Sequence, residues 1–249
     1  MGTRRTRRFW LCWALALAVT AVWTISVSPV QTSQPVGGAA HGSYVALTFD
    51  DGPWPGTTNT LLDGLAQRGV RATFFLVGEQ VADRAETVRR MADEGHQIGL
   101  HTWHHVSLKG MTPAQITSQL DQTRAAIRGI VGPVDLMLRP PYGFVDDALR
   151  QWAKAPIICW SLDTEDWKDP TPSRITADIL RQVKDGDIIL MHDIFDTSVT
   201  AALAAVDQLL AQGYRLVTVE ELFAQRGQDP QPGAVYCSLP PAQKEEVEP

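Results

Sequence analysis

The 249-residue chain contains little cysteine, with three residues in all. None belongs to a Cys-x-x-Cys pair, which excludes the usual cysteine-based zinc sites. Cys12 falls in an apolar N-terminal run, Cys159 in a predicted buried strand and Cys237 in a proline-rich tail. A disulfide between Cys159 and Cys237 would need a compartment outside the cytoplasm, and the sequence alone does not favour it.

Basic residues are also scarce relative to acidic ones. The chain has 22 Lys and Arg against 28 Asp and Glu, for a net charge of −6. This balance argues against nucleic acid as the main partner. A hydrophobic content of 44% over this length is enough for one sizeable core. We therefore expect a single globular domain with appendages that acts as a monomer.

Only one long hydrophobic run occurs, at residues 9–27, and four arginines precede it within the first eight residues. A basic segment before an apolar one is the layout of an export signal or a signal-anchor. The run is long for a cleaved signal and just long enough to span a bilayer. We predict that residues 1–27 anchor the chain in the cell membrane, with the rest outside the cytoplasm, or secreted if the segment is cleaved. Residues 28–42 have a linker composition.

Short apolar runs then alternate with helical patterns. Seven strands are predicted, at residues 45–49, 73–77, 97–100, 135–138, 157–160, 187–191 and 215–217. Helices are predicted at residues 58–67, 85–94, 113–129, 146–153, 172–183, 199–211 and 220–225. Near-continuous apolar strands separated by helices indicate a parallel sheet with helices outside.

The predicted domain, residues 43–226, is short for a complete (β/α)8 barrel of about 250 residues. We therefore predict an α/β fold in the form of a distorted or incomplete (β/α) barrel of about seven parallel strands. A flat doubly wound sheet is the alternative. From residue 227 onward Gln, Asp, Pro and Glu dominate, so residues 227–249 are predicted to be a disordered tail.

Polar clusters follow five of the predicted strands, each at the strand's carboxyl end. They occupy residues 50–51, 101–105, 139–143, 163–167 and 192–193. In a parallel α/β protein these ends share one face, which is where active sites lie. Chance placement would scatter the clusters between both ends, so their common position predicts one active-site mouth.

His101 and His105 are four residues apart and would present two imidazoles to one metal ion if the chain made a helical turn there. A neighbouring carboxylate completes a 2-His-1-carboxylate set, typical of hydrolytic zinc or of iron. His104 is a competing ligand by count, but the spacing favours His105. Asp50 and Asp51 alone are typical of a capping residue and a turn residue; beside these histidines they are candidate ligands.

Arg139 stands between apolar residues and two prolines, where a cation is costly unless a carboxylate pairs with it. That pair either organises the mouth or contacts substrate. Tyr142 and Trp167 are candidate groove walls, although ordinary packing would also place aromatics there. His192 supplies a proton donor near neutral pH if a carboxylate raises its pKa.

Five motifs in order, over residues 44–226, resemble the polysaccharide deacetylases that carry the NodB homology domain, carbohydrate esterase family 4. They are TFDDGP at 48–53, HTWHH at 101–105, RPPYG at 139–143, DTEDW at 163–167 and LMH at 190–192. Two positions depart from the family's usual pattern, since Leu100 replaces a common polar residue and Phe195 a common histidine. Both departures concern substrate preference and leave the motifs intact.

The resemblance implies that Asp51, His101 and His105 bind a divalent metal, zinc or cobalt. It implies that Asp50 is the general base and His192 the general acid. The remaining residues that it implies support these groups or hold substrate: Arg139 orients Asp50, the Tyr142 backbone N–H stabilises the oxyanion, Trp167 walls the groove and Leu190 lines the acetyl pocket. Asp163 and Asp166 both suit pairing with Arg139 or His192, and we favour Asp166.

The activity implied is removal of N-acetyl groups from a GlcNAc-type polysaccharide, peptidoglycan or chitin-like, to give acetate and a free amino sugar. An O-acetyl esterase acting on xylan would use the same site. A glycan-binding domain without activity is a third reading, which the intact set of site residues disfavours. An iron oxygenase would need a 2-oxoacid site that the sequence does not show.

Overall fold

The computed structural model describes residues 42–241. The predicted signal-anchor and nearly all of the predicted linker lie outside these residues. Within the described part of the chain, no helix is long and apolar enough to cross a membrane.

The described residues form eight strands: β1 (Tyr44–Asp50), β2 (Thr73–Leu76), β3 (Gln97–Leu100), β4 (Ile157–Ile158), β5 (Leu162–Asp163), β6 (Ile188–His192), β7 (Arg215–Val217) and β8 (Val235–Tyr236). The α-helices are α1 (Pro55–Arg68), α2 (Gly78–Asp83), α3 (Ala85–Asp93), α4 (Pro113–Val131), α5 (Asp147–Trp152), α6 (Pro172–Gln182), α7 (Asp196–Ala211) and α8 (Val219–Arg226). One turn of 3-10 helix, η1, spans Pro141–Gly143.

All strand pairs are parallel, and the main sheet runs in the order β3-β2-β1-β6-β5. β2 pairs with the second half of β1, and β7 pairs with its first half. An isolated bridge at Leu138 links β3 to β4, and β4 pairs with β8. The strands therefore run continuously from β5 round to β4 and β8. Among the described residues no strand pair joins β8 to β5, and a single antiparallel bridge links Asp187, just before β6, to Ser238, just after β8. This confirms the predicted incomplete (β/α) barrel with helices outside.

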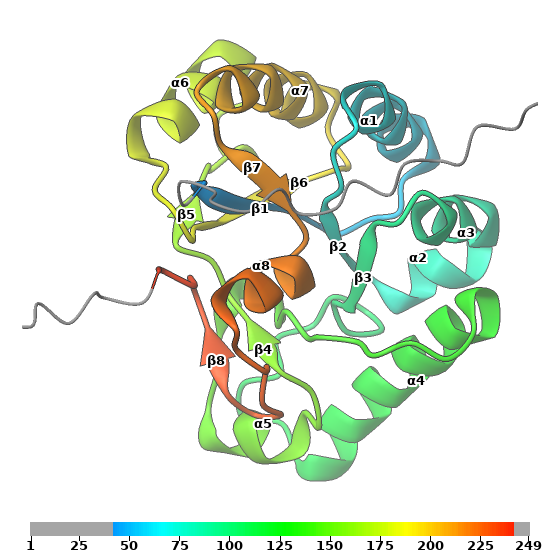
Figure 1. Cartoon of the computed structure of the whole chain (residues 1–249). Coiled ribbons are helices and arrows are strands. Elements are labelled where there is room, and N and C mark those ends of the chain that lie inside the picture. The colour runs from blue at the N-terminus through cyan, green and yellow to red at the C-terminus, as the bar shows by residue number, and fades with distance from the viewer. Residues whose placement is uncertain (1–41, 242–249) are drawn as a thin grey trace, which may run out of the picture. The chain divides into compact units, whose positions relative to one another are not determined.

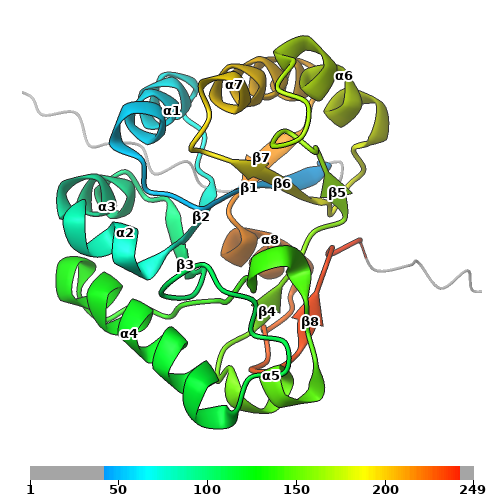
Figure 2. The ribbon, with the colours of Figure 1, turned by 180° about the vertical axis from the view of Figure 1, so that it is seen from behind.

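The outer helices surround the strands, whereas α8 lies in front of the strands in Figure 1 and behind them in Figure 2. Two apolar clusters follow from this arrangement. The larger, which includes Leu47 of β1, packs the strands against the outer helices. The smaller joins the alternate strand residues, such as Ala46 of β1 and Phe75 of β2, to Phe223 of α8. Since side chains alternate along a strand, Thr48 and Asp50 lie on the same inner face as Ala46.

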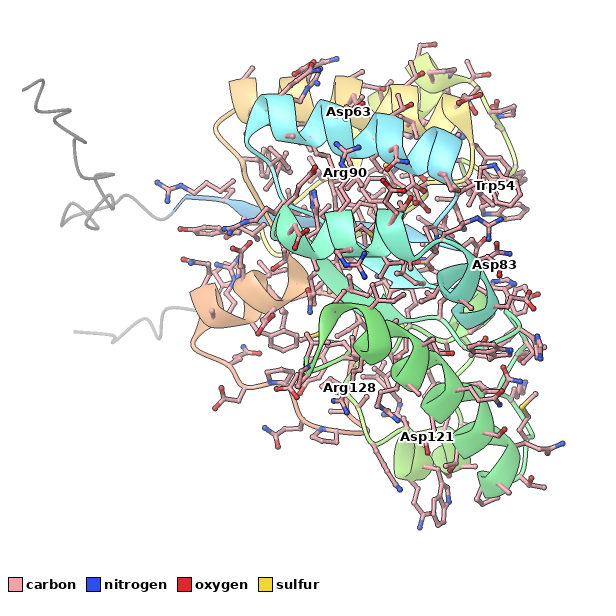
Figure 3. All side chains as sticks on the ribbon, turned by 90° about the vertical axis from the view of Figure 1, so that its right-hand side faces the viewer. Trp54, Asp63, Asp83, Arg90, Asp121 and Arg128 are labelled. Atoms are coloured by element: carbon pink, nitrogen blue, oxygen red, sulfur yellow. The ribbon has the colours of Figure 1, made fainter. Side chains whose placement is uncertain are left out.

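The sequence also explains where several helices begin. Thr112 and Thr218 each form a capping box at the N-termini of α4 and α8, with Gln115 and Glu221 as partners. Between helices, Arg90 Nη2 of α3 lies 2.6 Å from Asp63 Oδ1 of α1. Both residues are labelled in Figure 3. Both ion-pair partners are partly exposed, so the pair adds little stability and mainly sets orientation.

Four features differ from the sequence-based expectation. The predicted strand at 135–138 is reduced to the single bridge at Leu138, and α2 and β5 were not predicted, because both are short. The expected tail is folded as far as residue 241: β8 pairs with β4, and Leu239 is only 2% exposed. A few scattered apolar residues are enough to attach this proline-rich segment to the domain. They do not stand out in the average composition of the segment, so the sequence analysis missed them.

Candidate active site

Arg139 is fully buried and holds the inner face of β1. Its Nη1 donates to Thr48 Oγ1 at 2.6 Å and to Asp50 Oδ1 at 2.9 Å. Its Nη2 and Nε donate to the carbonyls of Cys159 and Ile158, at 2.9 and 3.2 Å. These four bonds pair the cation fully, as its burial requires, and fix one oxygen of Asp50.

Asp51 lies beyond the end of β1 in the left-handed region, at φ 74°. This turn, rather than strand alternation alone, aims its carboxylate away from that of Asp50. Its Oδ1 lies 3.3 Å from His101 Nε2 and 3.1 Å from His105 Nε2. Burial opposes ionisation, but the two imidazoles outweigh it and hold the pKa of Asp51 well below its usual range.

The two histidines are brought together by a loop and not by the helical turn expected from their spacing. His101 directly follows β3, and Thr102 and His105 both have left-handed φ values, of 62° and 53°. The imidazole centroids end 5.0 Å apart. His104 points away, with Nδ1 2.9 Å from Glu79, so the competing ligand is not in the cluster. Non-glycine residues in this conformation are costly and concentrate at functional sites.

The donor set fits a divalent metal. Asp51, His101 and His105 each offer one ligand atom, all within 4.8 Å of one another. Asp51 Oδ1 is buried without a hydrogen-bond partner among the described residues. The Arg139 carbonyl lies 2.7 Å from His101 Nδ1, so Nδ1–H donates to it and Nε2 keeps its lone pair for the cluster.

Asp166 holds His192, which is the partner of Asp50 across β1 and β6. Its two oxygens accept from the His192 backbone N–H at 2.8 Å and from Nδ1 at 2.7 Å. Burial lowers the pKa of His192, but Asp166, together with Asp50 and Asp51, outweighs burial and raises it to about 9. Asp163 does not share this role, because it is exposed and accepts from the Glu165 N–H at 2.9 Å.

Asp193 is a buried acid that sequence reasoning did not single out. It accepts a hydrogen bond from Thr58 Oγ1 of α1 and lies against Gly52, where an added Cβ would come within 2.5 Å of its carboxylate oxygens. Burial raises the pKa of Asp193 to about 7, although the Thr58 bond lowers it. Asp193 thus braces the loop that carries Asp51.

These groups open into one pocket of about 460 Å³. Its lining contains all the predicted ligands and catalytic groups except Arg139 and Asp166, which lie behind it: Asp50, Asp51, His101, His105, Tyr142, Trp160, Asp163, Trp167, Leu190, His192 and Phe195. A second pocket of about 510 Å³, which includes Arg128 and Lys154, lies where the chain enters β4 and contains none of these residues.

The pocket walls are aromatic. Tyr142 and Trp167, predicted as walls, are 61% and 58% exposed. Tyr142 has φ 64° and its ring meets that of His105 edge-on, with centroids 5.1 Å apart. Sequence reasoning missed Trp160 as a wall and Thr48 as a partner of Arg139. Alternation along β1 was a signal for Thr48, since it lies two residues before Asp50.

A carboxylate and two imidazoles lie at the carboxyl ends of parallel strands, bordered by an arginine-held acid and a further imidazole. This arrangement defines a candidate metallohydrolase. The sequence model described as polysaccharide deacetylase matches residues 37–156. Together with a relative that is 36% identical and covered to 87% of its length, this match shows that the chain belongs to the polysaccharide deacetylase family.

A peptidoglycan-N-acetylmuramic acid deacetylase of Bacillus subtilis is 42% identical over 198 residues, which are 80% of this chain and 41% of that protein. A peptidoglycan-N-acetylglucosamine deacetylase of Bacillus cereus is 36% identical over 188 residues, which are 72% of this chain and 87% of that protein. The chain thus spans about two fifths of the first relative and most of the second.

The fold also matches a solved family 4 acetyl xylan esterase from Clostridium thermocellum in complex with a cobalt ion. The two are 34% identical with a TM-score of 0.76, over 79% of this chain and 99% of that one. Relatives of comparable identity therefore include proteins named for different acetylated substrates.

Proposed function

We propose that this protein is a metal-dependent deacetylase that removes N-acetyl groups from a GlcNAc-type polysaccharide, releasing acetate and a free amino sugar. The observation that carries the proposal is that Asp50 and His192, partners across β1 and β6, both border the Asp51, His101 and His105 cluster. One pocket then holds a proton acceptor, a proton donor and a candidate metal site, which together are what hydrolysis of an amide requires.

Asp50 is the proton acceptor. Arg139 occupies its Oδ1, and Oδ2 faces the cluster, 3.8 Å from His101 Nε2. Oδ2 is therefore the atom that takes a proton from water in the pocket. Arg139 holds Asp50 in place, because the Arg139 side chain is itself fixed by three other acceptors.

His192 is the proton donor. Asp166 holds Nδ1, so the Nε2 edge faces the pocket, 4.0 Å from Asp51 Oδ2. An amide nitrogen is a poor leaving group, and the proton on Nε2 is available to it as the carbon–nitrogen bond breaks. The raised pKa of His192 keeps that proton in place at neutral pH.

Asp51, His101 and His105 would hold a divalent metal, and a set of one carboxylate and two imidazoles suits Zn²⁺ or Co²⁺. When bound, it supplies Lewis acidity toward the acetyl carbonyl and makes water more acidic. We also propose that the Tyr142 backbone N–H stabilises the oxyanion, that Leu190 contacts the acetyl methyl group and that Trp167 walls the sugar groove.

Peptidoglycan is the proposed substrate, because two relatives carry names for that activity. Acetylated xylan is the second candidate, supported by the acetyl xylan esterase of similar fold. The proposed proton acceptor, proton donor and metal site would serve either substrate, so these groups do not distinguish the two. We further propose that the chain acts outside the cytoplasm, anchored by residues 1–27 or secreted, as a monomer.

The deciding experiment measures acetate released by the purified chain from peptidoglycan, chitooligosaccharides and acetylated xylan, with and without a chelator. We expect release from the GlcNAc-containing substrates, loss on chelation, and recovery when Zn²⁺ or Co²⁺ is added back. Release that survives complete removal of metal contradicts the mechanism, and release from xylan alone contradicts the substrate.

Two variants separate the roles of the adjacent acids. Asp50→Asn should retain metal and lose about 10²–10⁴ of turnover, the usual contribution of a positioned base. Asp51→Asn should lose metal, and with it activity. Metal content is read by elemental analysis and turnover by acetate release. The opposite pattern, with metal lost only in Asp50→Asn, would reverse the assignment.

A further inference from the structure

The strand pair β4–β8 brings two cysteines of distant sequence position side by side. Ile157 pairs with Val235 and Ile158 with Tyr236, in parallel register. The next step of that register places Cys159 opposite Cys237. The Cys159 backbone N–H donates to the Tyr236 carbonyl at 2.8 Å, so the pairing continues to these residues.

This geometry suits a disulfide. Neighbouring strands lie about 4.8 Å apart, inside the roughly 4.4–6.8 Å range of Cα separations that disulfides span. Paired residues of parallel strands point to the same face, so both thiols lie on one side. Burial raises the pKa of the Cys159 thiol to about 11, and the neighbouring Cys237 thiol adds to the shift. Both cysteines are free thiols in the structure.

We propose that Cys159 and Cys237 form an intramolecular disulfide that ties the C-terminal segment 228–241 to β4. The segment is otherwise attached by a two-residue strand and by a few bonds, including Leu239 N–H to the Gly186 carbonyl at 2.8 Å. The tie also reaches the catalytic pocket, because the Cys159 carbonyl accepts from Nη2 of Arg139.

The bond forms by thiol–disulfide exchange with a low-molecular-weight disulfide. Cys237 is exposed and Cys159 half-buried, so the Cys237 thiolate attacks first and expels one thiolate of the reagent. The Cys159 thiolate then attacks the Cys237 sulfur and expels the second. Two protons leave the protein, its two thiols are oxidised, and the reagent is reduced to two thiols.

The test uses the full chain incubated with oxidised glutathione, then alkylated and digested without reductant. We expect a linked peptide pair containing Cys159 and Cys237. Cys12→Ser is the matched control, because it removes the third cysteine and keeps the pair. Alkylation of both Cys159 and Cys237, or a link between two copies of the chain, overturns the proposal.

Thermal unfolding gives the second measurement. The bond closes a loop of about 80 residues, so the oxidised chain should melt about 5–10 °C above the reduced chain. The same difference is expected in Cys12→Ser, and none in Cys237→Ser, whose changed side chain is exposed and compatible with folding. Equal melting of oxidised and reduced wild type overturns the tie. Neither measurement depends on acetate release, so the disulfide proposal is tested independently of the proposed function.

Discussion

Asp166 shows how one buried side chain sets the chemistry of another. It is 1% exposed, and both its oxygens are committed to His192. Burial disfavours the Asp166 anion, yet the hydrogen bond and charge of His192 outweigh burial and lower the pKa of Asp166. The pair is therefore an ion pair at neutral pH, with the proton on the imidazole.

The stability that follows has a definite sign. The folded-state pKa of His192 is about 9, above the ordinary value of 6.5. Its protonated form therefore stabilises the fold fully below about pH 6.5, and that contribution is lost as the pH rises through about 9. The same proton is the one proposed for catalysis, so alkali should remove both.

Asp166→Asn tests this coupling. Removing the anion should lower the pKa of His192, so the basic limb of the pH profile of kcat/KM should move down by about 1–3 units. Acetate release measured across pH checks it. Asp163→Asn is the matched control, because Asp163 borders the same pocket without bonding His192. A basic limb that moves equally in both variants would contradict the assignment of Asp166.

At the scale of the element, the loop between β1 and α1 positions Asp51, and Asp193 supports that loop. Asp193, at the end of β6, accepts from Thr58 of α1 and packs against Gly52. A side chain at residue 52 would collide with the Asp193 carboxylate. The glycine is thus required by close approach, since its φ lies outside the left-handed range.

Gly52→Ala should therefore lower stability by about 1–3 kcal/mol, as overpacking does, and weaken metal binding through the adjacent Asp51. Gly56→Ala is the control, because nothing lies within 4 Å of its added Cβ and alanine favours the helix. Chemical denaturation and metal titration measure the two effects. Equal stability and metal affinity in the two variants would mean that Asp193 does not brace the loop.

At the scale of the whole folded unit, the C-terminal segment completes the inner layer of the barrel. Leu239 joins the cluster formed by α8 and the inner strand residues, and its carbonyl accepts from Arg226 Nε at 2.8 Å. The segment therefore contributes to the same core that supports Arg139. In that core, the centroid of the Phe75 ring lies 4.3 Å from Arg139 Cζ.

Leu239→Ala should cost about 2–5 kcal/mol, the range for truncating a buried leucine. Leu210→Ala should change stability by less than about 0.5 kcal/mol, because Leu210 is 39% exposed on α7. Urea unfolding of both variants makes the comparison. A Leu239→Ala chain as stable as the Leu210→Ala chain would show that residues 228–241 do not belong to the folded unit.

The sequence by itself determined the parallel α/β class and the face on which the site lies. Apolar runs of strand length and helical periodicity are local signals, and the polar clusters at 50–51, 101–105 and 192–193 each follow their own strand. The five motifs in order indicated the family and identified the candidate site residues.

Only the tertiary structure decided which of these residues meet. Asp166 rather than Asp163 reaches His192, and Thr48 joins Asp50 on Arg139, because these contacts cross 26 to 91 positions of the chain. The left-handed turns at Asp51 and His105 and the pairing of β8 with β4 also escaped the sequence. Such contacts depend on the path of the folded chain, whereas propensity and periodicity act over a few neighbouring residues.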